Sequence, residues 1–105
     1  MEFAYAKKGL RDLCEIRATA EKQLGTQTAA GLRRRLADLD AATTIYDLIA
    51  EPVVETAVDE ERAVRIGDGR RLVFRSNHNK APVTAGKIDW TQVTRIQFLR
   101  IESDQ

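Results

Sequence analysis

The sequence predicts one α+β domain in which a helical hairpin packs on one face of a small, mainly antiparallel sheet. Two observations favour this class: a helical spacing of apolar residues over 7–42, and arginine-bearing, β-prone runs over 62–101. A loosely alternating start at 1–6 adds a first strand. With 105 residues, the chain is long enough for one core and too short for two. We therefore expect a single domain, 1–105, with the element order β-α-α-β-β-β.

The first half of the chain predicts two helices. Apolar residues recur at three- and four-residue steps from 7 to 24, and the pattern resumes until about Ala42. Gly25 suits the C-terminal end of the first helix, and Thr26 or Thr28 can cap the second. A tight turn between two helices makes them an antiparallel hairpin.

The connections after the helices should be short or irregular. Residues 45–49 predict one further helical turn, and Pro52 ends that pattern. The acidic run 53–58 is either an edge strand or an exposed connection. The loop 76–90 is too polar and broken for a strand, so we expect a surface excursion in which Asp89 caps one last helical turn.

A hairpin and a final strand complete the predicted sheet. Runs 62–66 and 70–75 flank Gly67-Asp68-Gly69, which is a strong hairpin signal because Gly and Asp tolerate the positive φ of tight turns. The run 93–101 is the last strand. Strand alternation then divides the second hairpin strand between two faces, with Arg71, Val73 and Arg75 on one face and Leu72 and Phe74 on the other.

The net charge of +1 conceals a division along the chain. Residues 36–61 carry eight acids and no base, whereas 62–100 carry nine Lys or Arg against two acids. Such asymmetry suggests a basic working face for phosphates or an acidic partner protein, although solubility alone also distributes charges unevenly. The acidic segment 51–61 could dock a partner or shield the basic face of its own chain.

Few conventional catalytic signatures are present. Cys14 lies on the apolar stripe of the first helix, where a thiol is usually a small core residue. His78 is the only histidine, so Cys and His are too few for a structural metal site. Trp90 and Tyr46 could stack on bases, but we expect each to anchor the core. No cofactor and no metal are expected.

The composition also limits the compartment. No apolar run approaches the roughly 18 residues of a membrane span, and the start lacks the pattern of a signal peptide. A single cysteine fits a reducing cytoplasm. We expect a cytoplasmic protein with no membrane partner.

Over nearly the whole chain, the sequence resembles the HigB-like branch of the RelE superfamily, which are toxins of bacterial type II toxin–antitoxin systems. The most specific stretch is Ile88-Asp89-Trp90-Thr91-Gln92-Val93-Thr94, and the others are 39–48, 71–74 and 99–102. The resemblance implies a RelE-like, microbial-ribonuclease-like fold and metal-independent, ribosome-dependent cleavage of messenger RNA. It also implies a helix-turn-helix, HigA-like antitoxin as partner, with DNA reached only through that antitoxin.

The chain departs from this branch at its end. Such toxins usually finish with an acidic residue and Asp-Tyr-His, whereas this chain finishes with Glu102-Ser103-Asp104-Gln105. Arg71 matches the Arg-Leu-x-Phe position and is expected to stabilise the scissile phosphate. Asp104, by position, and His78, by chemistry, are candidates for proton transfer. The expected RNA-binding residues are Arg65, Arg70, Arg75, Lys80, Lys87 and Arg100.

Two functions remain open at this point. The chain is either an active endoribonuclease toxin or a weakened relative that keeps the toxin fold to bind an antitoxin or RNA. Losing the terminal Tyr and His removes base and acid assistance, each worth about 10²–10⁴-fold. A DNA-binding role rests only on Arg33-Arg34-Arg35, without a recognition-helix motif.

Overall fold

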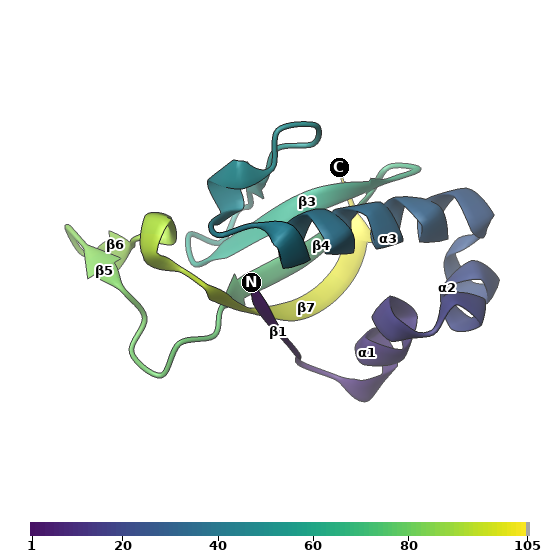
Figure 1. Ribbon diagram of the computed structural model, residues 1–105, viewed down its shortest axis with the longest axis horizontal. Helices are drawn as coiled ribbons and strands as arrows, with labels where there is room; N and C mark the ends of the chain where they lie inside the picture. The colour runs from purple at the N-terminus through teal and green to yellow at the C-terminus, as the bar shows by residue number, and fades with distance from the viewer. Residues whose placement is uncertain (105) are drawn as a thin grey trace.

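The computed structural model describes residues 1–104, in which three helices and two short 3-10 helices accompany a five-stranded sheet (Figure 1). A separate two-stranded hairpin protrudes at one end of the molecule, away from α1 and α2. In chain order the elements are β1 (Glu2–Tyr5), α1 (Lys8–Glu15), α2 (Arg17–Leu24), α3 (Thr26–Ala41), η1 (Ile45–Asp47), β2 (Val54–Glu55), β3 (Glu61–Gly67), β4 (Arg70–Ser76), β5 (Val83–Thr84), β6 (Lys87–Ile88), η2 (Trp90–Gln92) and β7 (Arg95–Ser103).

The main sheet has the strand order β1-β7-β4-β3-β2. β1 pairs with β7 in parallel, and the other neighbours are antiparallel. The predicted class, α+β with a mainly antiparallel sheet, is therefore confirmed. The acidic run after Pro52 forms the two-residue edge strand β2.

The first predicted helix is wrong in one respect, because the chain breaks it into α1 and α2 at Ile16. This residue has extended backbone angles, φ −111° and ψ 106°, and an exposed side chain. The two halves pack differently, since α1 contacts β1 and β7 as well as α3, whereas α2 packs mainly on α3. A single straight helix could not make both sets of contacts.

The hairpin turn between α2 and α3 is a single glycine. Gly25 has φ +86° and serves as both the C-cap of α2 and the N-cap of α3. The prediction for Gly25 is confirmed, and the predicted threonine cap is wrong. Thr26 is already the first helical residue, and Thr28 is buried.

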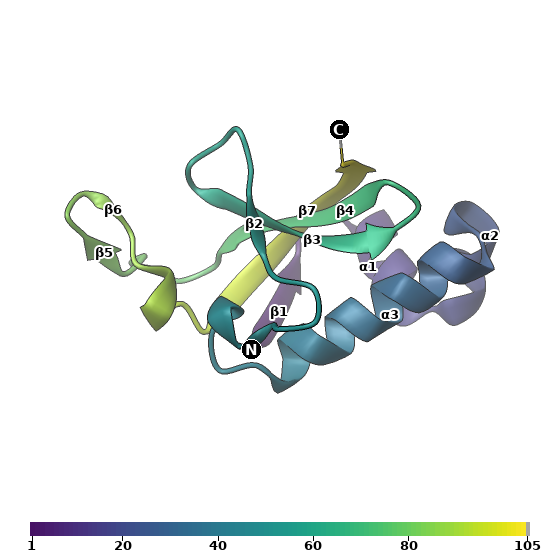
Figure 2. The same cartoon turned by 90° about the horizontal axis from the view of Figure 1, so that it is seen from above.

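Helix α3 lies along one face of the sheet and approaches β3 at a glycine (Figure 2). A Cβ atom built on Gly31 would collide with the main-chain carbonyl of Ile66 and lie 2.9 Å from its carbon. Leu32 and Leu39 on α3 pack into the same core as Val64 and Ile66 on β3. Only a residue without a side chain allows this contact between helix and strand backbones.

The core side of the sheet follows the predicted alternation. Leu72 and Phe74 are fully buried, and Phe98 packs edge-on against Phe74 with ring centroids 6.3 Å apart. Met1 lies beside this core, and its ammonium group donates to the carbonyl of Ala42 just after α3, at 3.1 Å.

The turns of the second half are mostly as predicted. The 67–69 turn has positive φ throughout and joins β3 to β4. Asp89 caps η2 by accepting a hydrogen bond from the main-chain N–H of Thr91. The 76–90 loop does contain strands, β5 and β6, so that prediction is wrong; the pairing of Val83 with Ile88 satisfies the backbone locally.

The last strand begins and ends two residues later than predicted. β7 runs through Ser103 because its end pairs with the start of β4, placing Glu102 opposite Arg71. Within residues 1–104, no helix combines the length and the apolar character that crossing a bilayer requires.

Candidate functional site

The face of the sheet away from α3 carries most of the predicted site residues, and we call it the charged face. Strand register aligns Arg65 with Arg71, and Arg71 with Glu102, across β3, β4 and β7. The next row along places Val73 opposite Arg100. Neighbouring residues in such rows lie about 5 Å apart, so these side chains meet.

Four side chains of the charged face form a continuous chain of ion pairs, which we call the inner cluster: Arg71, Glu102, Arg100 and Glu61. Arg71 donates from Nε and Nη2 to Glu102 Oε2, at 2.9 and 2.6 Å. Arg100 donates from Nε to the other Glu102 oxygen at 2.5 Å. It also donates from Nη2 and Nη1 to the two oxygens of Glu61, at 2.7 and 3.2 Å.

Two groups of the inner cluster, Glu102 and Arg100, are stabilised in their charged forms. Hydrogen bonds from Arg71, and then from Arg100, lower the pKa of Glu102. The hydrogen bond to Glu61 raises the pKa of Arg100. Both directions follow from opposite charges in hydrogen-bond contact.

Two apolar residues share the charged face with the inner cluster. Val73 and Ala63 point to the charged face, yet both are fully buried. Arg71 precedes Val73 by two residues on β4, and Arg100 lies opposite Val73 on β7. Long arginine side chains can cover apolar surface with their methylene stems while the guanidinium groups stay at the surface.

Arg65 makes a separate contact, the outer pair, with Asp104. Its Nε donates to Asp104 Oδ2 at 2.8 Å, and its Nη1 lies 3.8 Å from Glu51. The Arg65 side chain is 54% exposed, whereas that of Arg71 is 18% exposed. The Arg65 guanidinium is thus more solvated than that of Arg71, whereas the two carboxylates, Asp104 and Glu102, are both partly buried.

The acidic segment faces its own arginines. Glu51 approaches Arg65, Glu61 binds Arg100, and Glu55 lies 4.0 Å from Arg62 on β3. This geometry supports the alternative in which segment 51–61 shields the basic side chains of the same chain.

The predicted catalytic residues lie at two ends of the sheet. Arg71 and Asp104 share one end, since Asp104 follows β7 and its N–H donates to the carbonyl of Gly69. His78 lies at the other end, where its Nε2 accepts hydrogen bonds from the N–H groups of Thr94 and Arg95. The nine residues of β7, about 30 Å of extended chain, separate the two ends. Because its Nε2 accepts both of these hydrogen bonds, the geometry of His78 fits the anchoring of a loop.

The predicted RNA-binding residues divide among several surfaces. Arg65, Arg75 and Arg100 lie on the charged face, where Arg75 is exposed and has no carboxylate partner among residues 1–104. Arg70 points to the opposite side, into a groove beside α1 and α2. Lys80 lies in the loop before β5.

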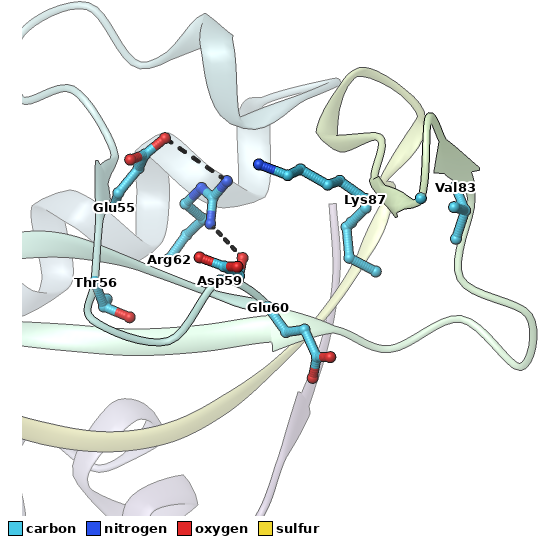
Figure 3. Close-up of a pocket in the computed structure, with 9 residues that line it drawn as sticks. Glu55, Thr56, Asp59, Glu60, Arg62, Val83 and Lys87 are labelled. Carbon is cyan, nitrogen blue, oxygen red and sulfur yellow. Dashed lines mark hydrogen bonds and ion pairs between the residues drawn. The ribbon is translucent and has the colours of Figure 1, made fainter.

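Lys87 belongs to a cleft of about 410 Å³ between the β2–β3 connection and the β5–β6 hairpin. Figure 3 shows Lys87 on one wall and Glu55 and Arg62 on the other. Arg62 is held in place by the carbonyls of Asp59 and Glu61, and its guanidinium lies 5.1 Å from the ring centre of Trp90. This cleft is separate from the charged face.

Three further predictions concern single side chains. Trp90 is buried in the core, as predicted, but Tyr46 is 64% exposed, so its prediction as a core anchor is wrong. Tyr46 sits in the short helix η1, whose only buried residue is Ile45. Burial raises the pKa of the Cys14 thiol to about 12, which leaves it un-ionised and unreactive at neutral pH.

The basic run of α3 is not one surface. Arg33 and Arg35 are half-buried, and Arg35 lies 3.2 Å from Asp38; Arg34 alone of the three is exposed. Within the described part of the chain, no three Cys, His, Asp or Glu side chains are placed to hold a metal.

Sequence reasoning missed the carboxylates of the inner cluster. Glu61 and Glu102 are far apart in the chain, and only strand register brings both to Arg100. One local signal was available, because Arg100 and Glu102 are two residues apart and so share a strand face.

Comparison with protein-family models, with curated proteins and with solved structures finds no match to this chain. A function is therefore inferred below from the fold, the charged face and the sequence pattern.

Proposed function

We propose that this chain is a HigB-like toxin of the RelE superfamily that binds messenger RNA on its charged face and cleaves it at the ribosome without a metal. One observation carries the proposal. Arginines from three adjacent strands, Arg65, Arg71 and Arg100, converge at one end of a sheet whose other face is packed against a helix. Such rigid guanidinium forks suit bidentate binding of phosphate oxygens.

The proposed chemistry is attack of an RNA 2′-hydroxyl on the adjacent 3′-phosphate. As the 2′-oxygen bonds to phosphorus, the bond from phosphorus to the 5′-oxygen breaks, which leaves a 2′,3′-cyclic phosphate and a 5′-hydroxyl that takes its proton from water. Arg71 would bind the non-bridging oxygens, where negative charge grows as the phosphate becomes pentacoordinate. Asp104 lies two residues after Glu102, the partner of Arg71. Its carboxylate would accept the proton of the 2′-hydroxyl. A carboxylate is a weaker general base than an imidazole, so cleavage should be slow without the ribosome.

The proposed partner is a helix-turn-helix antitoxin of the HigA kind. The sequence resemblance supports this partner, and the basic residues of 62–100 suit an acidic segment of it. Contact with DNA would then come through the antitoxin.

A second candidate function is a binding relative with little or no cleavage. One observation favours it: the guanidinium groups of Arg65, Arg71 and Arg100 are already bound to carboxylates of the same chain. An imidazole is also missing from this end of the sheet, because His78 is committed to the other end.

Induced expression of the wild-type chain and of Arg71→Ala in a bacterial host separates the two functions. An active toxin should arrest growth and leave mapped cuts in transcripts, and both should vanish in Arg71→Ala. Arg17→Ala is the matched control, because Arg17 is an exposed arginine of α2 paired only with Glu21. Co-expression of a helix-turn-helix antitoxin should restore growth.

Circular dichroism of each purified variant must show a folded protein. Normal growth and intact transcripts with a folded wild type would reject the toxin and favour the binding relative. Equal arrest by the wild type and Arg71→Ala would reject the role of Arg71.

A further inference from the structure

We propose that Arg65 is a phosphate subsite whose resting occupant is the Asp104 carboxylate of the same chain, and that an RNA phosphate displaces this carboxylate. The inference rests on the proposed function, since it specifies how RNA gains access to the charged face. The outer pair and the inner cluster differ in exposure and in the number of their hydrogen bonds. We therefore expect a phosphate to displace the carboxylate of the outer pair and to leave the inner cluster intact.

The outer pair is held weakly. A single hydrogen bond of 2.8 Å joins the side chains of Arg65 and Asp104, and the arginine side of the pair is open to water: the Arg65 side chain is 54% exposed and that of Asp104 21%. Exposed ion pairs of this kind contribute little to stability because water and salt screen them. Replacing the carboxylate by another oxyanion therefore costs little.

The inner cluster is held at several points. Glu102 accepts two hydrogen bonds from Arg71 and one from Arg100, and Arg100 makes two more with Glu61. Opening any one contact leaves the other groups partly buried beside unpaired charges, which is costly. A phosphate should therefore enter at Arg65 before it reaches Arg71.

The displacement needs only a side-chain rotation. The main-chain N–H of Asp104 donates to the carbonyl of Gly69 at 2.6 Å, and this bond survives when the carboxylate turns away. Glu51 stays 3.8 Å from Nη1 of Arg65, and the guanidinium then offers Nε and Nη2 as a two-pronged donor to a phosphate. Arg65 lies opposite Arg71 in the register, so a phosphate at Arg65 puts the neighbouring nucleotide within reach of Arg71.

The test compares Asp104→Asn with Asp68→Asn. Asp68 lies in the exposed turn next to Gly69, so its substitution removes the same charge from the same end of the sheet without touching Arg65. Asn tolerates the positive φ of Asp68. Two probes are titrated into each folded protein: inorganic pyrophosphate, followed by calorimetry, and a fluorescent single-stranded RNA, followed by anisotropy.

Asp104→Asn should bind both probes about two- to fivefold more tightly than the wild type, and Asp68→Asn should stay close to the wild type. The gain should disappear in the double variant Arg65→Ala/Asp104→Asn. RNA binding without a gain in Asp104→Asn, or a gain that survives Arg65→Ala, would overturn the exchange and leave the proposed function standing. A pyrophosphate gain with no RNA binding by any variant would support the exchange at Arg65 and overturn the proposed function. Failure of every variant to bind either probe would overturn both.

Discussion

The two faces of the sheet are built from different interactions. On the helix side, Leu72, Phe74 and Phe98 are fully buried, and Gly31 brings α3 against the backbone of β3. On the charged face, carboxylates and guanidinium groups neutralise one another over a thin apolar layer that includes Val73. Closely packed apolar side chains cannot move apart without loss of the fold, whereas ion pairs at the surface can exchange partners. The helix side therefore supplies the close packing, and the charged face carries the ion pairs that the proposed RNA binding would use.

The largest effect should come from the helix side. Gly31→Ala places a methyl group against the main-chain carbonyl of Ile66, so α3 must shift away from β3. We expect a loss of about 2 kcal/mol in the free energy of unfolding, measured by urea denaturation.

Gly9→Ala is the control for Gly31→Ala. Gly9 is also a helical glycine, but a Cβ atom there has open space. This substitution should stabilise the protein by about 0.5–1 kcal/mol through helix propensity alone. Equal effects at the two positions would contradict the close approach of α3 and β3.

A smaller effect is expected on the charged face. Glu102→Gln removes the carboxylate that accepts from both Arg71 and Arg100, and should cost about 1 kcal/mol near neutral pH. Because the folded-state pKa of Glu102 is lowered, its contribution is present above the ordinary glutamate pKa of about 4.3. The contribution is lost as the pH falls through the lower, folded-state pKa. The difference in unfolding free energy between wild type and variant should therefore be constant from pH 5 to 8 and shrink in more acid solution.

Glu15→Gln serves as the control for Glu102→Gln. Glu15 pairs with Arg11 on the exposed side of α1, and its loss should cost only about 0.3 kcal/mol. A cost at Glu102 no larger than at Glu15 would mean that the inner cluster does not stabilise the sheet.

The smallest expected effect is a difference between Glu102 and Asp89, two carboxylates at opposite ends of the sheet, in how their pKa responds to salt. Hydrogen bonds from the Thr91 hydroxyl, then from Gln92 and Thr84, lower the pKa of Asp89 to about 2. Its partners are neutral, unlike the arginines that bind Glu102. In a carboxyl-carbon NMR titration, added salt should raise the pKa of Glu102 and leave that of Asp89 nearly unchanged. A salt response at Asp89 equal to that at Glu102 would contradict this distinction.

Much of the fold follows from local chemistry. The 67–69 turn, the glycine that ends α2 and the Asp89 cap each depend on residues a few positions apart, so pattern and residue type predict them. The alternation of Leu72 and Phe74 with the arginines likewise needs only the period of a strand.

Other features depend on what lies across the fold. The break at Ile16 carries no glycine or proline, and it arises because α1 packs on β1 and β7 as well as α3, whereas α2 packs mainly on α3. The exposure of Tyr46 depends in the same way on where η1 sits over the core.

The sequence by itself determined the class of fold, the hairpin and the presence of arginines on one sheet face. Only the tertiary structure decided that Arg65, Arg71 and Arg100 are paired with acids, and with which acids. Arg71 and Glu102 are 31 residues apart, and Arg100 and Glu61 are 39 apart. A register shift between Val73 and Phe74 sets which residues of β4 and β7 meet. The physical reason is that a one-residue slip in strand register changes every cross-strand pair, and register is set by packing of the whole sheet.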